Sequence, residues 1–298
     1  MSEEFMAARQ RARLAFTNLI AGENASIDLA RAALLIAAEE YPGLDIDRHL
    51  NHLDELAAQV RLYLENLPEP AIDLPVVEPE REHVRILRAL SKVLFEQEHF
   101  RGSRADYYNP QNSFLNRVLE RRLGIPLTLS LIYIEVGKRL GLTIEGVGMP
   151  FHFIVRYTLP NQHFIYIDPY EQGKFLSEQD CRRRLVQVFK NPEDLDTHWL
   201  EPLDSKQFLV RMLANLKHIY IHKKDYQRAL SICDRILLLN PRLPIEVRDR
   251  GIVSFHLKRY SRALRDLNAY IELAPQAEDI ADVRQQIKII RQLLAMMN

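Results

Sequence analysis

Apolar residues recur at helical spacing through most of the first 100 residues. Between residues 46 and 64 they fall at every third or fourth position, which is the period of one helix face. A preceding helix is expected to start at Ser26 or Asp28 and to stop at the turn signal that follows residue 40. Residues 80–100 show the helical period again, whereas the proline-rich stretch 68–79 cannot lie inside a helix. The pattern therefore predicts a helical first third with a connector at 68–79.

The pattern changes after residue 100. Residues 126–140 are apolar on almost every side, which predicts a buried helix that begins at Pro126 and ends at Gly141. Shorter runs of β-prone residues follow, at residues 143–147, 151–157, 163–167 and 174–176. A turn sequence separates the second run from the third, so these two are expected to form a hairpin. This part of the chain therefore predicts a small antiparallel sheet beside one buried helix.

Polar residues mark the ends of two further helices. Ser113 is expected to cap a short helix that ends near Leu123, with Gly124 at its C-terminal cap. Ser177 and Asp180 have the spacing of a capping box, which predicts a helix that opens at this point.

The last third of the chain contains a repeat. Tyr226, Ala229 and Pro241 recur 34 residues later as Tyr260, Ala263 and Pro275. This period is typical of tetratricopeptide repeats, in which pairs of antiparallel helices stack on one another. Residues 279–297 are expected to form a capping helix at the end of the array.

The composition excludes several classes of protein. The 298 residues are 47% hydrophobic and 27% charged, as in a folded protein with a full core. Forty basic and forty acidic residues give a formal net charge of zero, so no long-range field favours nucleic acid or an anionic membrane. No apolar run approaches the roughly 18 to 20 residues that span a bilayer, and the acidic first residues do not form a signal peptide. The two cysteines form neither a disulfide framework nor a metal-spaced set, which predicts a reducing compartment, the cytoplasm.

His152 and Asp168 are the candidate chemical pair. His152 stands at the start of one strand of the predicted hairpin and Asp168 at the end of the other, so their side chains are expected to meet. A carboxylate beside a histidine fixes the imidazole tautomer and raises its basicity. Two interpretations remain open: a structural hydrogen bond that ties two strands together, and a functional pocket that is catalytic or ligand-binding.

The segments around this pair resemble the transglutaminase-like superfamily. The matching residues are Gly124, Ile125, Pro126, Ser130, Leu140, Gly141, Leu142, His152, Asp168 and Pro169. The stretch 107–120, followed by 124–130, is similar to the signature of the SirB-type invasion-regulator family of bacterial proteins. The resemblance implies a transglutaminase-like (papain-like) core followed by tetratricopeptide repeats. It also implies a triad of His152, Asp168 and a cysteine at the start of the core helix.

The sequence departs from the superfamily at the nucleophile. Counted back from Gly141, the superfamily's cysteine falls on Pro126, which carries no nucleophile. Cys181 belongs to a predicted helix after the core, and Cys233 fills an apolar repeat position, so neither replaces it in the sequence. The resemblance therefore carries over the histidine and aspartate positions but not the cysteine position.

Other polar residues near the core have both a structural and a functional interpretation. Thr128 and Ser130 are candidates for an altered nucleophile, but hydroxyls in an apolar helix usually bond to the carbonyl four residues back. Asn109, Asn112 and Ser113 are interpreted as turn and cap residues, and their loop is also placed to border the candidate pocket.

Three charged features have ordinary structural interpretations. Glu135 lies in the buried helix and requires a partner such as an arginine. Residues 182–184 are three arginines that we interpret as a solvated helix face rather than a phosphate site. A metal site that joins His99 and His163 to the candidate pair has no support from spacing, and no cofactor is expected.

These observations predict a mostly helical α+β protein. Residues 1–200 are expected to form a helical region plus the transglutaminase-like core, and residues 204–298 the repeats with their capping helix. One hypothesis is a non-catalytic regulatory module whose repeats bind a protein or peptide, with no nucleic-acid or membrane partner. The other is a hydrolase or acyl-transferase that uses His152 and Asp168 with an atypical nucleophile. Pro126 favours the first.

Overall fold

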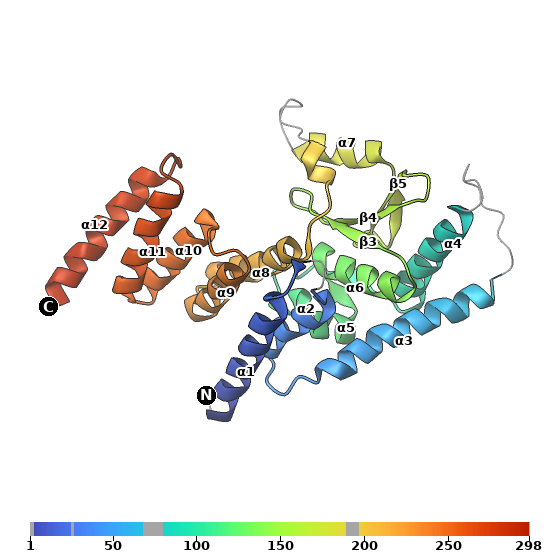
Figure 1. Cartoon of the computed structure of the whole chain (residues 1–298), viewed down its shortest axis with the longest axis horizontal. Helices are drawn as coiled ribbons and strands as arrows, with labels where there is room; N and C mark the ends of the chain where they lie inside the picture. The colour runs from blue at the N-terminus through green and yellow to red at the C-terminus, as the bar shows by residue number, and fades with distance from the viewer. Residues whose placement is uncertain (1–2, 25–26, 68–79, 189–196, 298) are drawn as a thin grey trace. The chain divides into compact units, whose positions relative to one another are not determined.

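The computed structural model describes residues 3–24, 27–67, 80–188 and 197–297. The predicted connector at 68–79 lies outside the described residues. The chain divides into two compact units, Met1–Phe208 and Leu209–Asn298, and Figure 1 shows the elements of each.

Four α-helices of the described residues precede the first strand of the first unit. They are α1 (Glu3–Ile20), α2 (Leu29–Ala38), α3 (Ile46–Glu65) and α4 (Glu80–Ser91). The Asp28 carboxylate accepts a hydrogen bond from Arg31 N and caps α2. Of the two starts predicted for this helix, Ser26 and Asp28, the structure therefore has Asp28. The helix predicted over 80–100 is α-helical only to Ser91 and continues as one π-helical stretch, Lys92–Gln97.

The segment before the buried helix differs from its prediction at both ends. Phe114, not Ser113, is the N-cap of α5 (Leu115–Arg121), because Ser113 closes a 3₁₀ turn, Pro110–Ser113. Arg122 is the C-cap, with a left-handed φ of 57°. Gly124 belongs instead to β2 (Leu123–Gly124), which pairs in parallel with β1 (Arg101–Gly102).

The predicted buried helix and antiparallel sheet are both present. Helix α6 (Pro126–Arg139) is buried continuously from Pro126 to Gly137. Four antiparallel strands lie in the order β3 (Ile144–Val147), β4 (Ile154–Thr158), β5 (Phe164–Asp168) and β6 (Lys174–Leu176). The predicted hairpin is confirmed by the pairing of β4 with β5. Strand β4 begins three residues later than predicted, because Phe151 has a φ of 57° in a turn that His152 N closes by donating to Met149 O.

Helices cover the sheet. Cys181 and Leu185 of α7 (Glu178–Val188) pack in one apolar cluster with Ile154 and Tyr166, and α6 contacts β3 and β4. Figure 1 shows α7 above the strands and α6 below them. The capping box predicted at the start of α7 is confirmed, since Ser177 N donates to Asp180 Oδ2 and Asp180 N to Ser177 Oγ. A 3₁₀ turn, Thr197–Leu200, follows α7.

The second unit is a row of antiparallel helices. Helix α8 (Ser205–His222) runs into it, and α9 (Tyr226–Leu239), α10 (Pro244–His256), α11 (Tyr260–Leu273) and α12 (Ile280–Met297) follow. Each of the last four contacts its neighbour in sequence, as stacked repeats require. The repeated tyrosines, Tyr226 and Tyr260, open α9 and α11. The predicted α+β architecture is thus confirmed. No helix in the described part of the chain is both long and apolar enough to cross a membrane.

Candidate functional site

His152 and Asp168 meet at one end of the four-stranded sheet. His152 lies in the loop before β4, and Asp168 is the last residue of β5. His152 Nε2 and Asp168 Oδ2 are 2.8 Å apart, which confirms the predicted pairing of the two side chains. The histidine side chain is 21% exposed and the carboxylate is fully buried, so the pair presents imidazole to solvent and keeps the carboxylate behind it.

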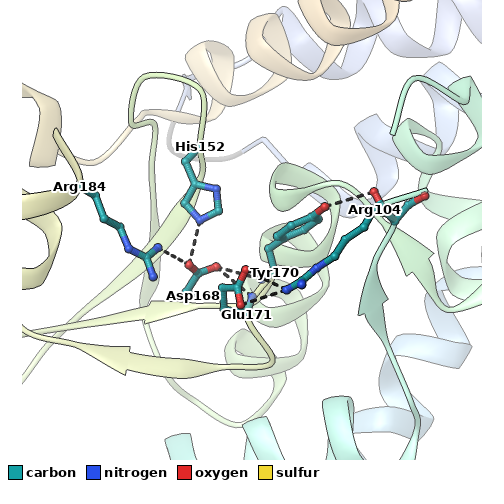
Figure 2. A network of polar contacts seen from close by, with 7 residues as sticks. Arg104, His152, Asp168, Tyr170, Glu171 and Arg184 are labelled. Carbon is teal, nitrogen blue, oxygen red and sulfur yellow. Dashed lines mark hydrogen bonds and ion pairs between the residues drawn. The ribbon is translucent and has the colours of Figure 1, made fainter. Parts of the chain in front are cut away.

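The Asp168 carboxylate is hydrogen-bonded on both oxygens (Figure 2). Oδ2 accepts from His152 Nε2 and Arg184 Nη1, and Oδ1 accepts from the backbone N–H groups of Tyr170 and Glu171. Burial acts to raise the pKa of Asp168, but the hydrogen bonds and positive charges of His152 and Arg184 outweigh burial and lower it. An ionised carboxylate only accepts hydrogen bonds, so Nε2 carries the proton and Nδ1 is the basic nitrogen of neutral His152.

Arg184 is a site residue that the sequence analysis missed. Its Nη1 lies 2.5 Å from Asp168 Oδ2, whereas Arg182 and Arg183 pair with acidic residues of α7 itself. The interpretation of 182–184 as a solvated face is therefore wrong for Arg184 alone. The available signal was helical spacing, because Arg184 stands three residues after Cys181 and so lies beside the apolar face that packs on the sheet.

Tyr170 joins the pair to the preceding part of the core. Its ring lies edge-on to the His152 ring, with centroids 6.1 Å apart, and its hydroxyl donates to Ser103 O at 3.1 Å. The ring packs so close to the backbone of Gly102 that a Cβ there would come within 2.4 Å of it. Figure 2 shows Tyr170 beside an ion pair between Arg104 and Glu171, which holds the outer part of the same turn.

Pro126 occupies the first position of α6, where its missing N–H costs no helical hydrogen bond. Thr128 completes the cap: its Oγ1 accepts from Ile125 N at 3.1 Å and donates to Asn112 O at 2.8 Å. The Thr128 hydroxyl therefore bonds to backbone groups before the helix, and not to the carbonyl four residues back that a hydroxyl inside a helix usually contacts. Ser130 is fully buried, and its Oγ has no hydrogen-bond partner in the described part of the chain. A serine nucleophile needs a base within hydrogen-bond reach, so this environment gives Ser130 no activation.

Of the loop residues singled out by the sequence, Asn109 and Asn112 have the structural roles expected of them, whereas Ser113 closes the 3₁₀ turn and does not cap α5. Asn109 Oδ1 accepts from Gln111 N and caps the 3₁₀ turn. Asn112 is fully buried; its Nδ2 donates to Asp106 O, and its Oδ1 accepts from Arg121 Nη1. Ser113 is also fully buried. The hydrogen bond between Thr128 and Asn112 brings this loop to the start of α6, and its role as a pocket border stays a prediction.

Neither cysteine has the environment of a nucleophile. Cys181 and Cys233 are both fully buried, and burial raises the pKa of each thiol to about 12. Glu135, in contrast, has the partner that its burial requires, because Arg139 Nη1 lies 2.8 Å from its Oε2. Among the described residues, no three histidine, cysteine, aspartate or glutamate side chains are grouped so that they could hold a metal ion.

Comparisons with known proteins agree with this architecture. A family model described as the transglutaminase-like superfamily matches residues 47–214, and a tetratricopeptide repeat model matches residues 216–288. A UPF0162 protein of Xylella fastidiosa strain Temecula1 is 35% identical over 272 residues, which cover 90% of this chain and 92% of the relative. A UPF0162 protein of Vibrio cholerae is 29% identical over 197 residues, 66% of this chain and 72% of the relative.

Another kind of relative matches only part of the chain. F-box only protein 21 of Mus musculus is 35% identical over 139 residues, which are 44% of this chain and 21% of the mouse protein. The match to the superfamily model covers more than half of the chain, and the match to the Xylella protein covers nearly all of it. The chain therefore belongs to the transglutaminase-like superfamily, among the UPF0162 proteins, and carries tetratricopeptide repeats after its transglutaminase-like core.

Proposed function

We propose that this protein is a non-catalytic regulatory module, in which a transglutaminase-like core without its nucleophile is joined to repeats that bind a protein or peptide. The observation that carries the proposal is Pro126 at the first position of α6. The resemblance to the superfamily implies a cysteine at this position. The proline side chain has no atom that can attack a carbonyl carbon, while its fixed φ preserves the helix start.

The other nucleophiles of the described core support the same conclusion. Burial raises the pKa of the Cys181 thiol to about 12, which disfavours the nucleophilic thiolate near neutral pH. The Thr128 hydroxyl is committed to the helix cap, and the Ser130 hydroxyl lacks a base.

The repeats supply the binding function of the proposal. Stacked helix pairs leave an extended concave surface, which repeat proteins use to hold peptides and protein segments. We place the boundary between residues 200 and 204, so that the whole of α8 belongs to the repeat array. The proposal includes a SirB-type regulatory role in the cytoplasm, with no nucleic-acid or membrane partner, in keeping with the zero net charge.

One observation favours a second candidate function. The buried, ionised Asp168 orients His152 as a catalytic aspartate would, and a purely structural bond does not require this charge. The alternative is a hydrolase or acyl-transferase in which the pair activates a water molecule or an atypical nucleophile.

The deciding experiment assays the wild-type chain on glutamine-amide and peptide substrates before and after alkylation of its thiols. We expect no cysteine-dependent turnover. Turnover that alkylation abolishes, and that a Cys181→Ser or Cys233→Ser variant also loses while remaining folded, contradicts the proposal. Turnover that survives alkylation but is lost in His152→Ala supports the hydrolase instead.

A gain-of-thiol variant tests the placement of the missing nucleophile. Pro126→Cys should react with iodoacetamide faster than a free thiol, with a pKa below the ordinary value of about 8.5, because the helix N-terminus and His152 favour the thiolate. Pro126→Ala, which removes the same ring without adding a thiol, is the matched control. Adding His152→Ala to Pro126→Cys should slow the reaction; an ordinary thiol pKa in Pro126→Cys would contradict the alignment of Pro126 with the cysteine.

A further inference from the structure

A cavity of about 490 Å³ lies in the first unit, lined by side chains other than those of the His152 pair. Its lining residues are Phe95, His99, Arg101, Arg121, Arg122 and Gln172. They come from the π-helical stretch, from the loop that follows it (His99), from β1, from the end of α5 and from the turn that Asp168 caps. The volume falls within the range of roughly 300 to 1,000 Å³ that is usual for small-molecule sites.

The lining is strongly basic. Three arginines face the cavity, and no aspartate or glutamate is among its lining residues. Arg101 is exposed and has no hydrogen bond or ion pair from its side chain within the part of the chain that the structure describes. Arg121 uses Nη1 for Asn112 and Arg122 uses Nη2 for Glu98, which leaves further N–H donors on both guanidinium groups.

Negative groups near the cavity reduce this charge in part. Glu98 pairs with Arg122, and Glu55 acts together with Glu98 and Arg122 on His52. Arg122 follows the end of α5 and Phe95 lies in the last turns of the π-helical stretch, so two helix C-termini are close, each equivalent to at most about half a negative charge. The described residues that line the cavity nevertheless carry three guanidinium groups and no carboxylate.

Three residues that line the cavity also have an unfavourable, left-handed backbone conformation. His99, Arg122 and Gln172 have φ angles of 58°, 57° and 57°, and the described part of the chain has only seven such non-glycine residues. Glycine adopts this conformation at less cost, and it is the usual residue directly after a helix. Long polar side chains stand here instead, and all three line the same cavity.

We propose that this cavity binds the phosphate group of a small phosphomonoester. A carboxylate has two oxygens, which together accept from a single guanidinium group. A phosphate monoester has three terminal oxygens, which can accept from Arg101 and also from the remaining donors of Arg121 and Arg122, so phosphate fits three arginines better. The volume leaves room for the esterified group, which would pack on the buried ring of Phe95. This site uses neither His152 nor the repeats, so it stands independently of the function proposed above.

The test is calorimetric titration of the full chain with phenyl phosphate and with benzoate, at an ionic strength of about 0.15 M, where unspecific surface attraction is screened. Phenyl phosphate should bind saturably, about tenfold or more tighter than benzoate. Arg101→Gln should weaken phenyl phosphate binding by about fivefold or more, because it removes unpaired charged donors. Gln172→Glu should abolish binding, because it adds a negative charge to the lining.

A matched control separates a site from general charge. Arg88→Gln removes one positive charge from an exposed residue of α4 that does not line the cavity, and it should change affinity by less than about twofold. Both altered lining positions are exposed, so thermal melts of the variants should match the wild type. No saturable phenyl phosphate binding below about 10 mM, equal binding of benzoate, or an equal loss in Arg88→Gln would each overturn the proposal.

Discussion

The Asp168 carboxylate accepts hydrogen bonds from His152, from Arg184 and from two backbone N–H groups of its own turn. His152 and Arg184 both stand 16 residues away, one on each side of it in the sequence. Such a buried carboxylate remains charged because two cationic or polar partners converge on the same oxygen. The partners in turn gain fixed positions, since Asp168 holds the imidazole ring and anchors α7.

The first prediction concerns this carboxylate. Asp168→Asn should lower the free energy of unfolding by about 2–4 kcal/mol, because the amide puts a neutral group opposite Arg184 and the remaining charge loses its partner. Glu178→Gln is the control, since it breaks an exposed pair with Arg182 and should cost less than about 0.5 kcal/mol. Urea unfolding measures both, and equal costs would show that the buried network is not stabilising.

The second prediction concerns pH. The pKa of Asp168 is lowered below its ordinary value of 3.8, so the unfolded chain binds the proton first and Asp168 stabilises the fold above about pH 4. This contribution should be lost as the pH falls through the lowered pKa. In Arg184→Met the pKa should move up towards the ordinary value, so stability should fall less steeply below pH 4. Arg182→Met, whose partner Glu178 is half exposed, should retain the wild-type slope in urea unfolding measured across this range.

At the scale of elements, the turn after β5 packs against β1. The Tyr170 ring covers Gly102 and its hydroxyl bonds to Ser103 O, so two short elements distant in sequence are locked by one aromatic side chain. Strand β1 pairs in parallel with β2, which directly precedes α6. The position of the candidate pair relative to the start of α6 therefore depends on this contact.

The third prediction is a double-mutant cycle on that contact. Gly102→Ala should cost about 1–3 kcal/mol in the wild type, because the added Cβ overlaps the Tyr170 ring. In a Tyr170→Ala background the same change should cost less than about 0.5 kcal/mol, since the obstacle is gone. Additive costs in urea unfolding would show that the cost of Gly102→Ala does not come from overlap with the Tyr170 ring.

At the scale of the whole molecule, each compact unit contains one buried thiol. Cys181 lies in the first unit and Cys233 in the second, and burial raises the pKa of both to about 12. A buried thiol reacts only when its surroundings open, so the two cysteines report separately on the stability of the two units.

The fourth prediction uses these reporters. Iodoacetamide should modify both thiols at least about 100-fold more slowly in the native chain than in urea. Because burial raises the folded pKa, the thiols leave stability unchanged below their ordinary pKa of about 8.5, and stability should be lost as the pH rises from there towards about 12. Peptide mapping by mass spectrometry distinguishes the two sites. Rapid modification of either cysteine in the native chain would contradict its burial.

Much of the fold follows from local patterns in the sequence. Residues 126–140 are apolar on almost every side, which favours a buried helix, and the 34-residue period favours stacked helix pairs. The hairpin also places His152 near Asp168, because two strands joined by a short turn must run side by side. Strand ends and caps were less predictable, since Ser113 and Gly124 have good capping chemistry and yet lie in a 3₁₀ turn and a strand.

What the sequence determined by itself is therefore the main helices, the four-stranded sheet, the repeat, the candidate pair and the proline at position 126, whereas the short β1–β2 pair and the π-helical stretch were not predicted. Only the tertiary structure decided that Arg184, alone among residues 182–184, pairs with Asp168, and that Tyr170 packs on Gly102. It also decided that arginines from β1 and α5 share one cavity with Gln172. The physical reason is that helical and strand periods depend on residues that are neighbours in the sequence. The partners of a buried charge depend instead on distance in space, which is set only when the packing of the core brings remote segments together.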